Sequence, residues 1–165
     1  MNSTRKPVAV IVGATSKWQS DGRNTKLAHG KELDDSHLPV GVRWGVGGAI
    51  AQKFAQEGYL VVLTTRTAAN ATALQTAINE QGGDSIIVEL DLVSGDSISN
   101  AFSKVRDEVG DPEVLVYNAG YLEGRDLPQE KELIEYIPDE MFETAQHIAS
   151  RGPFLVAKEV LPAMR

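Results

Sequence analysis

The chain has 165 residues, of which 42% are hydrophobic and 24% are charged, a length and composition that suit one globular domain. Its 16 basic and 23 acidic residues give a net charge of -7, which excludes a general binder of nucleic acids or anionic membranes. It contains no cysteine, and no apolar run approaches the roughly 18 residues of a membrane span. The segment before the first apolar run is too short for a signal peptide, so we expect a cytoplasmic protein.

The first predicted element is a strand over residues 8–12, an unbroken apolar run that ends at Gly13. Because apolar and polar side chains do not alternate in it, we expect this strand to be buried on both faces, as in a parallel sheet. Residues 16–43 follow, and they mix charged residues with Gly, Asn and Ser without a helical or strand period. We predict that they form a flexible inserted loop, which is unusual inside a compact domain.

The remaining chain alternates helix and strand. Apolar residues at helical spacing predict helices, and short runs rich in β-branched residues predict strands. The predicted helices run from Gly45 to a stop at Gly58 and over 68–81, 96–109 and 139–164, and the predicted strands span 59–65, 85–91 and 113–117. Pro153 should kink or interrupt the last helix, because proline has no backbone N–H.

The order β-α-β-α-β-α-β-α predicts an α/β fold, a Rossmann-like doubly wound parallel sheet with helices on both faces. With four strands, the predicted sheet is an incomplete version of that fold. Right-handed crossovers place the carboxyl ends of the strands at one edge, where ligands bind in such sheets. We therefore interpret 1–165 as a single dinucleotide-binding domain with 16–43 as its inserted loop.

The glycines Gly45, Gly47 and Gly48 lie at the start of a predicted helix, downstream of the first strand. A dinucleotide site needs glycine there because the backbone approaches the pyrophosphate closely, and the helix N-terminus offers free N–H groups to the phosphates. Glycines that serve only loop and helix packing would give the same pattern. Both interpretations stay open on this motif alone.

With residues 16–43 set aside, the chain resembles the opening of the short-chain dehydrogenase/reductase family. That family carries Gly-x-x-x-Gly-x-Gly between its first strand and first helix, an acidic residue after the third strand, and Asn-Ala-Gly after the fourth. A segment from Gly152 to Met164 also resembles the family's long interface helix. The resemblance implies a cofactor site formed by Gly13, Thr15, Gly45, Val46, Gly47, Asp91, Leu92, Asn118, Ala119 and Gly120.

The choice of cofactor can be argued from the charge that follows the second strand. A dinucleotide fold that prefers NAD has an acidic residue there to bind the ribose 2′-hydroxyl. This strand ends in Thr64-Thr65-Arg66, without a carboxylate. A guanidinium can bind a 2′-phosphate with two hydrogen bonds, so we favour NADP over NAD and add Arg66 to the cofactor site. The alternative is that Arg66 is a solvated loop residue.

The departures from the family pattern concern catalysis. In that family a Tyr-x-x-x-Lys pair and an upstream Ser transfer the proton during hydride exchange. None of the four tyrosines in this sequence is followed by a lysine four residues later. Ala149 stands in place of a further family Asn, and Tyr117 stands in place of the first of two Asn residues. We assign no catalytic residue, and the chain resembles a cofactor-binding half without the catalytic half.

A metal site is not predicted. His29 and His37 lie near Asp34 and Asp35, but their spacing matches no zinc pattern, and a solvated loop is the favoured interpretation.

The leading hypothesis is an NADP(H)-linked oxidoreductase of small-molecule carbonyls or alcohols, inactive as this chain because the catalytic residues are absent. An alternative is a non-catalytic fragment that binds dinucleotide or a partner subunit. A third is an incomplete product, in which 16–43 is retained non-coding sequence and the end of the chain reflects early termination. The resemblance of the predicted 139–164 helix to a family interface also allows a homo-oligomer through that helix.

Overall fold

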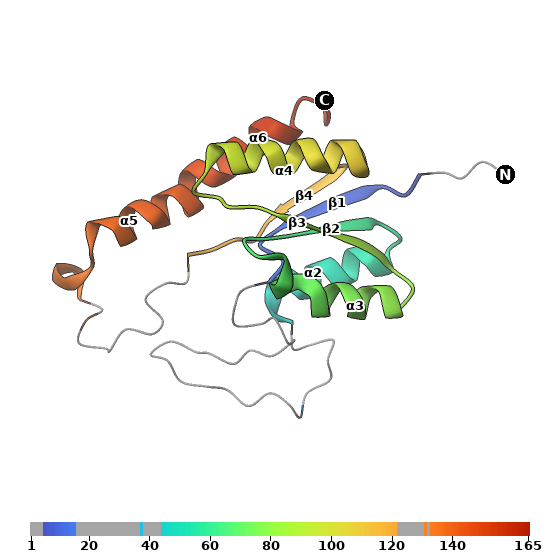
Figure 1. Ribbon diagram of the computed structural model, residues 1–165, viewed down its shortest axis with the longest axis horizontal. Coiled ribbons are helices and arrows are strands. Elements are labelled where there is room, and N and C mark those ends of the chain that lie inside the picture. The colour runs from blue at the N-terminus through green and yellow to red at the C-terminus, as the bar shows by residue number, and fades with distance from the viewer. Residues whose placement is uncertain (1–4, 16–36, 38–43, 122–130, 132) are drawn as a thin grey trace.

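The computed structural model in Figure 1 describes residues 5–15, 37, 44–121, 131 and 133–165. In this part of the chain four strands form one sheet: β1 (Val8–Val12), β2 (Leu60–Thr65), β3 (Asp84–Glu89) and β4 (Val114–Tyr117). Their order is β3-β2-β1-β4, and every pairing is parallel. The predicted α/β parallel-sheet fold is confirmed. Most of the predicted inserted loop, 16–36 and 38–43, lies outside the described residues.

Helices cover both faces of the sheet (Figure 1). One face carries α2 (Gly45–Gln56) and α3 (Thr72–Glu80), the latter preceded by the 3-10 turn η2 (Ala68–Ala71). The opposite face carries α4 (Gly95–Glu108) and α6 (Gly152–Val160). Before α6 come the short turn η4 (Ile134–Tyr136), the helix α5 (Asp139–Gln146) and the π-helical turn η5 (His147–Arg151).

The central strand β1 packs into both layers, as its sequence predicts. All five of its residues are fully buried. Val8, Val10 and Val12 belong to the core under α4 and α6, while Ile11 belongs to the core under α2 and α3. An apolar side chain is needed at every position because successive residues of a strand point to opposite faces.

The third strand is shorter than predicted. It ends at Glu89 instead of Asp91, because its only neighbour in the described sheet, β2, ends at Thr65. The Leu90 N–H still donates to the Thr65 carbonyl, and beyond that point no β2 residue remains to pair with. Asp91 is thereby released from the sheet and lies at its carboxyl edge.

The last helical stretch begins at the predicted residue but ends at Val160, four residues before the predicted end. It is not broken at Pro153. Instead its backbone widens to a π-helical turn over His147–Arg151, which ends two residues before Pro153, and Pro153 sits in the first turn of α6. A proline fits there because the first turn of a helix does not require its N–H.

Candidate functional site

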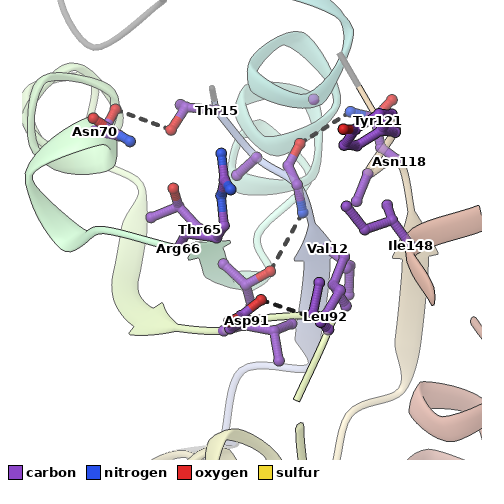
Figure 2. Close-up of a pocket in the computed structure, with 18 of the residues that line it drawn as sticks. Val12, Thr15, Thr65, Arg66, Asn70, Asp91, Leu92, Asn118, Tyr121 and Ile148 are labelled. Atoms are coloured by element: carbon purple, nitrogen blue, oxygen red, sulfur yellow. Dashed lines mark hydrogen bonds between the residues drawn. The ribbon is translucent and has the colours of Figure 1, made fainter. Parts of the chain in front are cut away.

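A cavity of about 280 Å³ opens at the carboxyl edge of the sheet (Figure 2). Residues at or after the ends of all four strands line it, together with the start of α2 and Ile148 of η5. All the residues that the sequence analysis assigned to the cofactor line this cavity, with the exception of Gly45. The structure therefore brings together residues from Gly13 to Gly120 that the sequence separates widely.

The turn between β1 and α2 forms the floor of the cavity, and glycine is required in it. Gly13 has φ +81°, and a Cβ there would lie 2.7 Å from the Cα of Ala119. A Cβ on Gly47 would lie 2.7 Å from Nδ2 of Asn118 and 2.9 Å from the carbonyl oxygen of Ala14. These two glycines let the turn approach the end of β4 closely, and a larger residue at either position would force this glycine cradle apart.

A hydrogen-bonded link ties that turn to β4. Asn118 Nδ2 donates to the Gly13 carbonyl at 3.0 Å, and the Asn118 N–H donates to the Val12 carbonyl at 2.8 Å. Asn118 thus holds the turn in place as well as lining the cavity. Gly48 has a different role, since a Cβ there would meet Trp44 and Gly48 does not line the cavity. The packing interpretation of the glycine motif holds for Gly48.

The N-terminus of α2 meets the cavity through Val46 and Gly47. Gly45, its first residue, has φ +69° and turns the chain into the helix without lining the cavity. Trp44 provides no side-chain cap to this 12-residue helix, and its first turn contains no acidic residue. Uncapped N–H groups and the positive end of the helix dipole suit a phosphate group.

The β2 end of the cavity carries the positive charge. Figure 2 shows the exposed Arg66 side chain extending from the end of β2 into the cleft. Thr15 lies near it and donates its hydroxyl hydrogen to the Asn70 carbonyl at 2.9 Å. Beside this group, Glu89 accepts a hydrogen bond from the Ala68 N–H at 2.8 Å. Arg66 directly follows Thr65, and Thr65 pairs with Glu89 of β3. A guanidinium and a carboxylate therefore lie at the same end of these two strands.

After β3, Asp91 and Leu92 present different chemistry. Asp91 is exposed at the cavity, and its Oδ1 accepts a hydrogen bond from the Val93 N–H at 3.1 Å. Leu92 is 8% exposed and packs mainly into the core under α4. Asp91 can offer a carboxylate oxygen to a ligand, whereas Leu92 offers mostly an apolar wall.

The β4 end of the cavity is formed by Asn118, Ala119, Gly120, Tyr121 and Ile148. Sequence analysis missed Tyr121 and Ile148 as lining residues. Tyr121 directly follows the Asn-Ala-Gly motif, which is the signal that would have found it. Ile148 comes from η5 by tertiary packing, and no local pattern marks it.

Behind this wall, Tyr117 at the end of β4 donates its hydroxyl hydrogen to the Ile148 carbonyl. Burial raises the pKa of Tyr117 to about 12, so it stays a neutral donor at physiological pH. Tyr117 and Ala149 are the two positions that depart from the family's Asn residues. In the fold they approach one another, because Ala149 follows Ile148 in the same π-helical turn.

In the described part of the chain, no group of three or more His, Asp or Glu side chains could hold a metal ion. His37 lies in an exposed turn, while His29, Asp34 and Asp35 lie outside the described residues. Within the same residues, the helices fall short of the length and apolar character that crossing a membrane requires.

The fold and the cleft define a Rossmann-like α/β protein with a ligand site at the carboxyl ends of its strands. Residues 41–165 match the family described as Enoyl-(Acyl carrier protein) reductase. Together with its oxidoreductase relatives and structural neighbours, this match shows that the chain belongs to the short-chain dehydrogenase/reductase family.

Among curated relatives, an uncharacterized oxidoreductase, YxjF, of Bacillus subtilis is 26% identical over 128 residues, which are 78% of this chain and 47% of the relative. The 3-oxoacyl-(acyl-carrier-protein) reductase FabG of Aquifex aeolicus is 37% identical over 84 residues, or 50% of this chain and 34% of that protein. The chain therefore spans about half the length, or less, of these relatives.

Solved structures agree on the fold. A metagenomic short-chain oxidoreductase in complex with NADP gives a TM-score of 0.69 at 24% identity, covering 98% of this chain and 58% of that one. L-Sorbose reductase from Gluconobacter frateurii, complexed with NADPH and L-sorbose, gives 0.68 at 23% identity, covering 97% and 48%.

Proposed function

We propose that this chain binds a nicotinamide dinucleotide in the cleft, with NADP(H) favoured over NAD(H), as the cofactor-binding half of a carbonyl–alcohol oxidoreductase. One observation carries the proposal. The glycine cradle of Gly13 and Gly47, the uncapped start of α2 and Arg66 all meet in one cavity at the strand ends. This is where α/β sheets of this kind bind ligands.

The strand order gives the cofactor a direction in the cleft. The pyrophosphate would lie at the β1–α2 turn, over Gly13, Val46 and Gly47. Because β2 and β3 lie on one side of β1 and β4 on the other, the adenosine would extend toward Arg66 and Asp91. The nicotinamide half would then extend toward Asn118 and its neighbours. In this orientation each predicted site residue that lines the cavity has a part of the cofactor to contact.

The preference for NADP rests on charge. Arg66 follows β2, where a 2′-phosphate would lie, and it lines the cavity. The nearby carboxylate of Glu89 accepts a hydrogen bond from the Ala68 N–H and does not line the cavity. A guanidinium binds a phosphate through charge-assisted hydrogen bonds. The structural neighbours named as NADP and NADPH complexes support the same choice.

For the reaction, a bound nicotinamide supplies or accepts the hydride, and protein groups must orient it and move a proton. The cleft residues of this chain can bind and orient, but the sequence contains no Tyr-x-x-x-Lys pair to move the proton. We therefore propose that the 165-residue chain by itself binds cofactor without measurable turnover of small-molecule carbonyls or alcohols.

A second candidate role, binding of a partner subunit, is favoured by the outer surface of the last helices. Phe142 of α5 and Phe154 of α6 are 62% and 63% exposed, and Leu161 and Met164, which follow α6, are also exposed. Large apolar side chains that are exposed on one pair of helices can mark an interaction site. A homo-oligomer through residues 139–164 would cover them.

The experiment for the primary proposal is a titration of the purified chain with NADPH and with NADH, followed by NADPH fluorescence or calorimetry. Saturable binding with a preference for NADPH is expected. Gly47→Ala should weaken binding about tenfold or more, since its Cβ would clash with the backbone of the β1–α2 turn and with Asn118 and displace them. Gly95→Ala is the matched control, because Gly95 lies outside the cavity and a Cβ there would come no closer than 3.4 Å to another atom, the end of the Arg151 side chain. Equal affinity of both variants for NADPH would contradict the proposed site.

A further inference from the structure

The hydrogen bond from Tyr117 to η5 compensates for a break in the helical backbone. In the π-helical turn the Gly152 N–H donates to the His147 carbonyl, five residues back. In an α-helix that N–H would serve the Ile148 carbonyl instead. The next N–H in the π register would belong to Pro153, which has none. The Ile148 carbonyl is thus deprived of both backbone donors, and the Tyr117 hydroxyl supplies the missing hydrogen bond.

Gly152 is matched to this arrangement. It is buried, and a Cβ there would lie 2.5 Å from the Tyr117 hydroxyl oxygen and 3.0 Å from the His147 carbonyl oxygen. The ring carbon that carries the hydroxyl would be 3.6 Å away, at an ordinary contact distance. Any side chain at residue 152 would therefore displace the hydroxyl from the Ile148 carbonyl. Tyr117, Gly152 and Pro153 act as one structural unit around η5.

This unit fixes one wall of the cleft. Ile148 lines the cavity at its β4 end, on the side where Figure 2 also shows Asn118 and Tyr121. Its backbone carbonyl is the group that Tyr117 holds, so the position of Ile148 depends on that hydrogen bond. The wall lies on the opposite side of β1 from β2 and Arg66.

We propose that Tyr117 is a positioning residue: its hydroxyl replaces the N–H that Pro153 lacks, holds the π-helical turn in register and keeps Ile148 against the nicotinamide half of a bound dinucleotide. This inference rests on the proposed cofactor site. Tyr117 itself does not line the cavity, so it acts through Ile148. Loss of the Tyr117 hydroxyl should not affect binding of the adenosine half, which would lie over β2 and β3.

The test compares two ligands that share the adenosine end. NADPH fills the whole cleft, whereas adenosine 2′,5′-bisphosphate reaches only the Arg66 side. Tyr117→Phe should weaken NADPH binding by about 3- to 10-fold, the usual range for one lost hydrogen bond, and leave bisphosphate affinity unchanged. Tyr59→Phe is the matched control, because Tyr59 packs edge-on against Phe54 and belongs to the opposite layer.

A rescue variant separates positioning from general damage. Pro153→Ala restores a backbone N–H that can serve the Ile148 carbonyl, so Tyr117→Phe with Pro153→Ala should recover most of the lost NADPH affinity. Gly152→Ala should lower the midpoint of thermal unfolding in the unaltered chain and lower it less in the Tyr117→Phe background, where the clash with the hydroxyl is absent. Amide exchange at 147–152 should accelerate in Tyr117→Phe and slow again in the double variant.

The outcomes are distinguishable. If the unaltered chain binds neither ligand, the proposed function fails, and the positioning role fails with it. If both ligands bind and Tyr117→Phe leaves NADPH affinity unchanged, or weakens both ligands equally without rescue, the inference alone is overturned. Selective loss of NADPH affinity together with rescue by Pro153→Ala supports it.

Discussion

Arg66 is the residue on which the cofactor preference depends. Arg66→Asp should reverse the order of affinity from NADPH to NADH, because a carboxylate repels a 2′-phosphate and accepts hydrogen bonds from a ribose hydroxyl. The lost charge-assisted contact is worth about 1.5–3 kcal/mol, or roughly 10- to 150-fold in NADPH affinity. Titrating both cofactors against both proteins measures the change. An unaltered ratio of the two affinities would assign Arg66 to solvent.

Tyr117 should also leave a signature in the pH dependence of stability. Its pKa in the folded chain, about 12, lies above the ordinary value of 10 because burial disfavours the phenolate. The stabilisation from the neutral phenol is therefore complete below pH 10 and is lost as the pH rises toward 12. Urea unfolding from pH 8 to pH 12 should show a steeper loss of stability for the unaltered chain than for Tyr117→Phe. Parallel curves would contradict this.

Short-range motifs explain which site residues sequence analysis found. Gly47 lies in a glycine motif at the start of a predicted helix and Asn118 directly after a predicted strand, and the parallel topology brings them to one edge. Ile148 lies in the middle of a helical stretch and reaches the cleft only by tertiary packing. The link from Tyr117 to η5 joins residues 31 apart in sequence, and no pattern in either segment encodes it.

At the scale of elements, the predicted segment 16–43 interrupts the β1–α2 turn. Both of its flanks are held by the core: Thr15 bonds to Asn70, and Trp44 is only 3% exposed. Deleting Ser16 to Arg43 should thus leave the fold intact and tighten NADPH binding, because the turn before α2 would close directly over the phosphates. Calorimetry of the deletion variant tests this, and unchanged or weaker affinity would mean that the segment contributes contacts of its own.

The hydrophobic period of each segment predicts whether it forms a helix or a strand. The residue at which a helix or strand ends depends instead on the elements packed beside it. The buried run of β1 and the helical periods of α2 and α4 specify their own structure. The end of β3 is set by where β2 stops, and the π-helical turn contains a carbonyl, that of Ile148, to which the distant Tyr117 hydroxyl donates. These features are set by tertiary contacts, so the sequence of one segment alone does not predict them.

At the scale of the whole molecule, the described sheet leaves one side of β4 without a strand partner. Its four residues are only partly buried, and an unpaired apolar edge favours association between chains. We expect the purified chain to associate with rising concentration in sedimentation experiments. Phe154→Glu should reduce association if the α6 surface also contributes, whereas Ile134→Ser, at an exposed position on η4, serves as its control. A monomer at all concentrations would contradict this expectation.

Parallel pairing at the centre of the sheet also has a consequence for how the chain folds. β1 forms its last pairing with β4, whose flanking hydrogen bonds join residues 105 positions apart. During synthesis at about 5–20 residues per second, an entirely apolar strand waits roughly 5–20 s for that neighbour. Pairing over such separations is slow because loop closure must precede any gain from contact. β1, which packs into both cores, is thus synthesised first and paired last. While it waits, binding by a chaperone or by another nascent chain competes with its folding.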